Sequence, residues 1–227
     1  MEQSSNEIKR YERKWVYKGQ DNLQIINALI RSKFFFNFQY TNRQVNSIYF
    51  DDAHYSSIRE NLDGVSQKEK YRIRWYGNKT NLNNAQLEIK RKIGFETTKK
   101  IKKIDKLKNL NILNDESLNS IENFTNDTLN LKKKIIPLLT THYNREYFVS
   151  NNKLIRATLD HNLESYDLRV NGNKDILKNY YNNKVLEIKY DISLDNFVRE
   201  NLKTISVRLS KNSKFVNSAI EEAFFYN

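Results

Sequence analysis

Residues 68–76, KEKYRIRWY, place a cation at every second position. This alternation is typical of a β-strand, because successive side chains of a strand point to opposite faces of the sheet. One face then carries Lys68, Lys70, Arg72 and Arg74, and the other carries Glu69, Tyr71, Ile73 and Trp75. Neighbouring like charges destabilise a sheet unless an opposite charge neutralises them. The stretch therefore predicts a strand whose charged face is turned towards an anion.

The same period-two charge recurs in other strand-like segments. The charged or polar faces are Glu12 and Lys14; Lys70, Arg72 and Arg74; Gln86, Glu88, Lys90 and Lys92; Tyr143 and Arg145; Arg156, Thr158 and Asp160; Glu187 and Lys189. A single segment of this kind is an ordinary solvated face. Because the pattern recurs with an excess of cations, it predicts an enclosed polar surface that binds an anion.

The order of elements predicts an α+β fold. Strands are expected at 11–17, 44–52, 67–76, 85–93, 141–150, 153–163 and 184–191, and helices at 21–34, 53–64, 193–205 and 214–225. Residues of about 97–138 are expected to form a helical insertion. Strands that follow one another with turn signals favour an antiparallel sheet. We expect a closed or nearly closed antiparallel β-barrel that forms a tunnel, with flanking helices, in one domain over residues 1–227.

Composition limits the class of protein and its partners. A formal net charge of +12 indicates an anionic partner: nucleic acid, anionic lipid or a phosphate-rich ligand. The chain has no cysteine, which excludes disulfides and thiolate sites. No apolar run approaches the length of about 20 residues that a membrane span needs, and the first residues lack an apolar signal-peptide core. We expect a cytoplasmic protein without a membrane span.

A nucleic-acid partner is not expected. Proteins that bind single strands place aromatic side chains among their basic residues, where bases can stack on them. Here Ile73, Trp75, Leu87 and Ile89 fall on the faces opposite the cations. The distribution of charge therefore favours a compact polyanion.

An ordered set of motifs carries a family resemblance. The motifs are ERK at 12–14, SIYFDD at 47–52, YRIR at 71–74, LEIKRK at 87–92, YNREYF at 143–148, LIRATLD at 154–160, LEIKY at 186–190 and SKF at 213–215. Together they resemble the VTC domain, the polyphosphate polymerase domain of the vacuolar transporter chaperone proteins. That domain belongs to the triphosphate tunnel metalloenzyme, or CYTH-like, superfamily.

The resemblance implies a β-barrel tunnel that binds triphosphate and longer phosphate chains. It implies that the basic ligands of phosphate are Lys14, Arg72, Arg74, Lys90, Arg145 and Arg156, with Tyr143 as a tunnel tyrosine and Lys214 as the lysine of a C-terminal Ser-Lys-aromatic motif. Lys189 follows Glu187 by two residues on the same strand face and is a further candidate of the site. One further lysine of the family follows the LEIK strand, and either Lys100 or Lys99 supplies it. Lys70 and Lys92 extend the same cationic faces and are expected to bind substrate.

The resemblance also implies a divalent metal, Mn²⁺ or Mg²⁺. Hard divalent cations prefer oxygen ligands, so carboxylates are the candidates. Glu187 is the first choice, followed by Glu12 and Glu88. For Glu12 and Glu88 an alternative has equal weight, namely that they pair with tunnel lysines and orient them.

The expected function is an ATP-dependent polyphosphate polymerase, with ATP, pyrophosphate or triphosphate and polyphosphate as partners. Phosphoryl transfer is accelerated mostly by positioning and by stabilising charge, so arginines, lysines and a metal are sufficient. Two alternatives remain open on the sequence. One is a metal-dependent triphosphatase, and the other is a non-catalytic module that binds polyphosphate.

Overall fold

The computed structural model describes residues 10–94, 96–108, 110–169, 178–202, 209–210 and 213–224. The strands are β1 (Arg10–Lys18), β2 (Asn37–Asp51), β3 (Gln67–Tyr76), β4 (Ala85–Ile93), β5 (Glu96–Ile104), β6 (Ile136–Val149), β7 (Arg156–Asp167), β8 (Lys178–Tyr181) and β9 (Asn183–Asp191). The helices are α1 (Asn22–Ile30), α2 (Ser56–Leu62), α3 (Asp115–Leu129), the 3₁₀ turn η2 (Ile192–Leu194), α4 (Asp195–Asn201) and α5 (Lys214–Phe224). None of the helices in these ranges is both long and apolar enough to cross a membrane.

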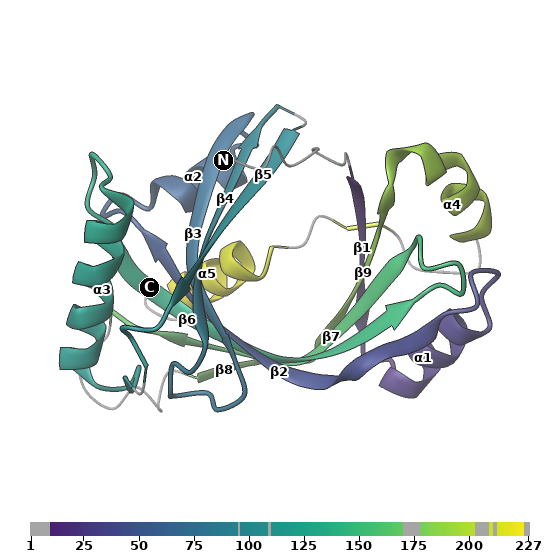
Figure 1. Cartoon of the computed structure of the whole chain (residues 1–227), viewed down its shortest axis with the longest axis horizontal. Coiled ribbons are helices and arrows are strands. Elements are labelled where there is room, and N and C mark those ends of the chain that lie inside the picture. Colours follow the sequence, from purple (N-terminus) through teal and green to yellow (C-terminus); the bar gives the residue numbers. More distant parts are fainter. Residues whose placement is uncertain are drawn as a thin grey trace. The chain divides into compact units, whose positions relative to one another are not determined.

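The strands form one sheet in the order β1-β9-β7-β6-β2-β3-β4-β5, and β8 pairs with β7 (Figure 1). The strand pairs with a defined register are antiparallel: β1 with β9, β2 with β3, β3 with β4, β4 with β5, β7 with β8, and β7 with β9. The α+β class with an antiparallel sheet is therefore confirmed. β1 and β5 are the two ends of the strand order.

The chain divides into two compact units. The first unit contains Met1–Asn42, Arg145–His161 and Asn182–Asn212, and the second contains Arg43–Asn144, Asn162–Tyr181 and Ser213–Asn227. The boundaries fall inside β2, β6 and β7, so each of these strands runs through both units. The expectation of a single domain stays a prediction.

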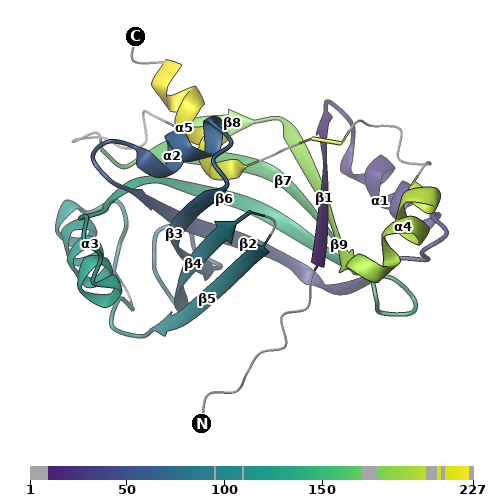
Figure 2. The ribbon, with the colours of Figure 1, turned by 90° about the horizontal axis from the view of Figure 1, so that it is seen from above.

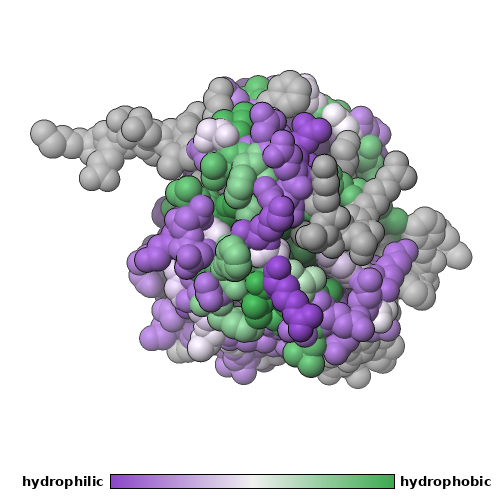
Figure 3. Space-filling view, turned by 90° about the vertical axis from the view of Figure 1, so that its right-hand side faces the viewer, coloured by the Kyte–Doolittle hydropathy of each residue, from purple (hydrophilic) through white to green (hydrophobic). Residues whose placement is uncertain are grey.

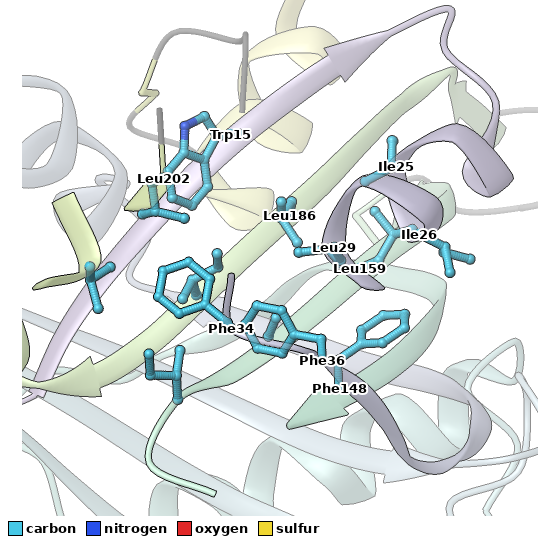
Figure 4. Packing of buried hydrophobic residues seen from close by; sticks show 14 of the residues in the cluster. Trp15, Ile25, Ile26, Leu29, Phe34, Phe36, Phe148, Leu159, Leu186 and Leu202 are labelled. Atoms are coloured by element: carbon cyan, nitrogen blue, oxygen red, sulfur yellow. The ribbon is translucent and has the colours of Figure 1, made fainter. Parts of the chain in front are cut away.

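The first unit is built around an apolar cluster beneath α1 and α4. Ile25, Ile26 and Leu29 project from one side of α1 and pack against Leu159 of β7 and Leu186 of β9 (Figure 4). The cluster fixes one face of β1, β7 and β9 as buried. Alternation then leaves the polar side chains of these strands on the opposite face.

On the side of the molecule drawn in Figure 3, hydrophobic residues form patches between hydrophilic ones.

In the second unit the apolar face of β3 is buried as the sequence predicted. Ile73 and Trp75 are fully buried and pack with Leu87 of β4 and with Leu118 and Ile121 of α3. The helix α3 begins where the side chain of Asn114 accepts hydrogen bonds from two backbone N–H groups of its first turn. The cations of β3 consequently lie on the other face of the sheet.

The acidic pair of the SIYFDD motif has a structural role. The carboxylate of Asp51 accepts hydrogen bonds from the backbone N–H groups of Ser57 and Ile58, at 2.9 and 3.1 Å, at the start of α2. Asp52 accepts from the N–H groups of His54 and Ser56, at 3.0 and 3.1 Å. These contacts satisfy N–H groups that have no partner inside the helix. In the two ribbon views α2 lies beside α5 (Figures 1 and 2).

The expected helical insertion at about 97–138 is wrong at both ends. Glu96–Ile104 forms β5, residues 136–138 belong to β6, and the helix α3 occupies only Asp115–Leu129. β5 has β-branched residues among its lysines, and Gly94, with φ +58°, provides the tight turn that returns the chain alongside β4. Pairing with β4 satisfies the backbone groups that a helix would otherwise satisfy internally.

Candidate functional site

Four charged residues of the second unit form what we term the arginine cluster: Arg72 and Arg74 of β3, Glu88 of β4 and Lys99 of β5. Arg72 lies directly opposite Glu88 in the β3–β4 register, and Arg74 shares its face two residues further on. Lys99 lies opposite Lys90 in the β4–β5 register, so it shares this face as well. The alternation read from the sequence thus brings these side chains together.

Glu88 holds the cations of the arginine cluster. Its side chain is 3% exposed, and it accepts hydrogen bonds from Arg72 Nε at 2.6 Å and from Lys99 Nζ at 2.8 Å, with Arg74 Nη1 at 3.9 Å. Burial opposes ionisation, but the charges of Arg72, Arg74 and Lys99 outweigh it and lower the pKa of Glu88 to about 2. Glu88 is therefore an ionised internal counter-ion that fixes the direction of Arg72 and partly neutralises the more distant Arg74. This geometry supports the alternative in which Glu88 orients cations.

Tyr49 of β2 extends the arginine cluster. Its hydroxyl accepts a hydrogen bond from Arg72 Nη1 at 3.4 Å, and its ring stacks on Phe215 of α5 with centroids 4.9 Å apart. Burial raises the pKa of the Tyr49 phenol, but the charges of Arg72, Arg74 and Lys214 outweigh burial and lower it. Such a lowered pKa reports a strongly positive local field.

Tyr143 and Lys214, both expected at the site, contact each other. The ammonium of Lys214 lies 4.7 Å from the centre of the Tyr143 ring, and the Tyr143 hydroxyl accepts from Arg74 Nη2 at 3.4 Å. Lys70 donates to Ser213 Oγ at 3.0 Å, which ties β3 to the SKF motif. The described part of the second unit thus gathers Lys70, Tyr143 and Lys214 around the arginine cluster.

The lysines after LEIK are separated by the pleat of β5. Lys99 lies on the face of Lys90 and Lys92, whereas Lys100 lies opposite Ile89 on the other face. Lys92 lies opposite Lys68 and Lys90 lies opposite Lys70, so both extend the cationic face of β3. The structure therefore places Lys99, and not Lys100, beside the arginine cluster.

The first unit holds a second group of charges, here called the glutamate–lysine cluster: Glu12 and Lys14 of β1, and Glu187 and Lys189 of β9. Lys14 lies opposite Glu187 and Glu12 opposite Lys189, so the four alternate in sign on one face. Lys14 Nζ lies 2.6 Å from Glu12 and 3.5 Å from Glu187. Lys189 Nζ lies 2.5 Å from Glu187 and 3.8 Å from Glu12.

Glu187 is ionised within this cluster. Its side chain is 9% exposed, and burial opposes its charge, but Lys189, Lys14 and Arg145 outweigh burial and lower its pKa to about 2. Burial lowers the pKa of Lys14, but the charges of Glu187 and Glu12 outweigh it and raise the pKa. The two carboxylates share both lysines, so they lie close to each other with their charges balanced.

The remaining predicted arginines are also in the first unit. Arg145 donates to the buried carboxylate of Asp160 through Nε at 2.6 Å and Nη2 at 2.7 Å, a forked pairing that fixes its guanidinium. Arg156 is exposed and lies opposite Lys189 in the β7–β9 register. Both therefore belong to the polar face of this unit.

The donor chemistry of the glutamate–lysine cluster fits a divalent metal. Glu12 and Glu187 supply carboxylate oxygens on neighbouring strands. Thr158 lies opposite Glu187 in the β7–β9 register, and its buried hydroxyl has no hydrogen-bond partner within the described residues. Among the described residues no group of three or more acidic, histidine or cysteine side chains is placed to hold a metal ion. Metal binding by Glu187 and Glu12 stays a prediction.

Comparison with known proteins defines the class. The VTC domain family model matches residues 6–221, which include both clusters. The chain therefore belongs to the VTC domain family, and the resemblance read from the ordered motifs is confirmed. Among curated proteins, none has a matching sequence.

Solved structures show the same fold. A "putative adenylate cyclase" from Bacillus halodurans has a TM-score of 0.53 at 12% sequence identity, covering 92% of this chain and 98% of its own. A "putative adenylate cyclase" from Vibrio parahaemolyticus has a TM-score of 0.51 at 13% identity, with the same two coverages. At these identities the likeness concerns the fold alone, and it agrees with the α+β fold with an antiparallel sheet that the sequence predicts.

Sequence reasoning missed Tyr49 in the second unit's site and did not decide between Lys99 and Lys100. Tyr49 lies within the quoted SIYFDD motif, but its place opposite Arg72 depends on the β2–β3 register, which no local pattern specifies. The sequence does not decide between Lys99 and Lys100, because a segment expected to be helical from about residue 97 offers no strand alternation that would separate them. Recognising a hairpin after Gly94 would have assigned Lys99 by alternation.

Proposed function

We propose that this VTC domain is an ATP-dependent polyphosphate polymerase, which transfers the γ-phosphate of ATP to a growing polyphosphate chain. Family membership supports a function with polyphosphate or triphosphate, and the polymerase reaction is the more specific step taken here. The main structural support is the arginine cluster. Arg72 is hydrogen-bonded to the buried carboxylate of Glu88, and Arg74 lies 3.9 Å from that carboxylate, on a strand face that carries further lysines.

The arginine cluster binds phosphoryl oxygens in this proposal. Guanidinium groups form directional, paired hydrogen bonds to phosphate, whereas lysines act as point charges along a chain. Glu88 and Tyr49 hold Arg72 in place before the substrate arrives, so less conformational freedom is lost on binding. Positive charge fixed near the transferring group stabilises the negative charge that develops in the transition state.

Glu187 and Glu12 would hold the divalent metal, Mn²⁺ or Mg²⁺, with the Thr158 hydroxyl as a neutral oxygen beside them. A bound metal neutralises charge on phosphate oxygens and aligns them for transfer. Lys14 and Lys189 balance the two carboxylates in the metal-free protein and remain to bind phosphate when the metal is present. Arg145, held by Asp160, presents a fixed cation on the same unit.

The test is incubation of the protein with ATP and either Mn²⁺ or Mg²⁺, with and without pyrophosphate as primer, followed by separation of products by chain length. The expected result is ADP together with phosphate chains longer than triphosphate. Chelation of the metal should stop the reaction. Orthophosphate as the sole phosphate product would overturn the polymerase and indicate a triphosphatase.

The same preparation distinguishes an enzyme from a binding module. Calorimetric titration with triphosphate measures binding independently of turnover. Binding without turnover under either metal would overturn the enzymatic proposal and leave a polyphosphate-binding module. Absence of both would overturn the function altogether.

A further inference from the structure

Five buried polar side-chain atoms of the second unit have no hydrogen-bond partner within the described residues. One is Asn83 Oδ1, and the other four are Ser47 Oγ, Arg74 Nε, Thr141 Oγ1 and Ser218 Oγ. The three hydroxyl-bearing residues are 0% exposed and Arg74 is 8% exposed. A buried polar group without a partner costs the free energy of removing it from water, so native proteins satisfy nearly all of them. Four in one unit call for a ligand or ordered water.

The four atoms come from elements that meet at the arginine cluster. Ser47 lies directly opposite Arg74 in the β2–β3 register, so their side chains share one face. Thr141 and Tyr143 are two residues apart on β6, so their side chains share one face of the strand. β6 is the strand next to β2 in the sheet, and Tyr143 accepts a hydrogen bond from Arg74. Their side chains therefore border the cations of this cluster.

Ser218 belongs to the same region through α5. It follows Lys214 by one helical turn and so lies on the same side of the helix. Lys214 lies over the ring of Tyr143, and Phe215 of the helix belongs to one buried apolar cluster with Tyr49 of β2 and Leu139 of β6. The Ser218 hydroxyl of α5 therefore lies in the same region as Tyr143 and Lys214.

The chemistry of the group favours an oxyanion. Arg74 Nε can only donate a hydrogen bond, and each hydroxyl can donate one. The neighbouring Arg72, Arg74 and Lys214 give this region the positive field that lowers the pKa of Tyr49. Donors arranged beside fixed cations satisfy phosphoryl oxygens, which have several lone pairs and carry negative charge.

We propose that Ser47, Thr141 and Ser218, together with Arg74 Nε, form a hydroxyl-lined subsite that binds one phosphoryl group of the oligophosphate. This proposal rests on the proposed function and specifies where one phosphate is held. The hydroxyls are neutral donors, so they add contacts to the phosphoryl oxygens without adding positive charge. The subsite thus holds a phosphoryl group by donor geometry, while the arginine cluster supplies the attraction.

Adjacent threonines of β6 provide a matched test. Thr141 and Thr140 are both buried but point to opposite faces, and Thr140 Oγ1 donates to the backbone oxygen of Ser47 at 3.1 Å. Thr141→Val removes an orphaned hydroxyl and keeps the shape of the side chain, whereas Thr140→Val removes a hydroxyl that already has a partner. Removal of an orphaned polar group stabilises a protein, and removal of a bonded one destabilises it.

The measurements are the melting temperature without ligand and the Kd for sodium triphosphate. For Thr141→Val we expect a melting temperature equal to or above that of the parent and a Kd weakened about tenfold, the size of one hydrogen bond to a charged group. For Thr140→Val we expect a lower melting temperature and a Kd within about twofold of the parent. Ser218→Ala should behave like Thr141→Val, and alanine in a helix favours folding.

The possible results separate this subsite from the function on which it rests. If the parent binds triphosphate and Thr141→Val and Ser218→Ala bind it equally well, the subsite is overturned while phosphate binding stands. A lower melting temperature with unchanged Kd in both variants would assign the hydroxyls to ordered water and also overturn it. If the parent itself does not bind triphosphate, the proposed function fails first.

Discussion

Arg72 is held from two sides in the proposed phosphate site. It bonds to Glu88 on one side and Tyr49 on the other, and its own charge attracts phosphate. Arg72→Ala should weaken triphosphate binding by about 1.5 to 3 kcal/mol, the range for hydrogen bonds to charged groups. Calorimetric titration measures this loss. The matched control is Arg91→Ala, because Arg91 pairs with Glu69 on the opposite face of the sheet.

A comparable loss in both variants would mean that general positive charge, and not the arginine cluster, attracts the ligand. Circular dichroism should first show that each variant is folded, because Arg72 and Arg91 both lie within strands.

Substitution of Glu187 should affect turnover and binding differently from substitution of Arg72. Glu187→Gln keeps the size of the side chain but removes the charge that would hold the metal, so metal-dependent turnover should fall by about tenfold or more. Binding of triphosphate without metal should persist or tighten, because a negative charge facing the polyanion has gone. Product analysis and metal-free titration measure the two effects. Glu122→Gln, which changes a carboxylate that pairs with Lys134 near α3, is the control.

Unchanged metal-dependent turnover in Glu187→Gln would exclude Glu187 as the metal ligand. Equal loss of metal-free binding and of turnover would place it among the phosphate-orienting residues instead.

The ionisation of Glu88 makes stability depend on pH. Its pKa falls from 4.5 to about 2 on folding, so its contribution is present above about pH 4.5 and is lost as the pH falls towards 2. Urea unfolding at several values of pH should therefore show stability falling through this window. In Glu88→Gln the slope should be smaller, and stability at pH 7 should be lower because Arg72 and Lys99 lose their counter-ion. Parallel pH profiles for the two proteins would contradict this assignment.

At the scale of elements, β5 shows how a local pattern can mislead. Its segment ETTKKIKKI is rich in lysine, a good helix former, and all but its last residue are exposed, so no buried alternation marks it as a strand. The strand forms because pairing with β4 satisfies its backbone, a tertiary effect that propensity does not contain.

The pleat of β5 gives a prediction for two adjacent lysines. Lys99→Ala should weaken triphosphate binding because Lys99 belongs to the arginine cluster. Lys100→Ala should leave the Kd for triphosphate within about twofold of the parent, since the Lys100 side chain lies on the other face of the strand. The two variants remove the same charge from neighbouring positions, so long-range electrostatics are matched. Equal effects in a titration would refute placement by strand alternation.

Other elements were predictable for identifiable reasons. β3 and β4 were predicted at 67–76 and 85–93, as the structure has them, because each strand has one buried apolar face and a turn residue at its end. β2 begins at Asn37 instead of 44, since its first residues are largely exposed and show no alternation. The register between strands, which places Tyr49 opposite Arg72 and Glu88 beside it, depends on pairing across the sheet and is not encoded in any one segment.

At the scale of the whole chain, the ordered motifs carried more information than any one of them. A single LEIK is an ordinary amphipathic strand, but the full order indicated the VTC domain, and the family model covers residues 6–221. The division into two compact units was not expected from the sequence, because β2, β6 and β7 each continue across a boundary without a composition change.

The last prediction concerns the response of the whole protein to phosphate chains of different length. A ligand that binds only the folded state raises the melting temperature by an amount that grows with the logarithm of the ratio of its concentration to its Kd. Several fixed cations contact several phosphoryl groups of one chain at once, so triphosphate should raise the melting temperature more than pyrophosphate, and orthophosphate should have little effect. Thermal unfolding at matched ionic strength measures this, because screening by salt would otherwise mimic a difference. Equal shifts for the three anions would contradict a multivalent site, and a larger shift with a single-stranded oligonucleotide would favour nucleic acid as the partner.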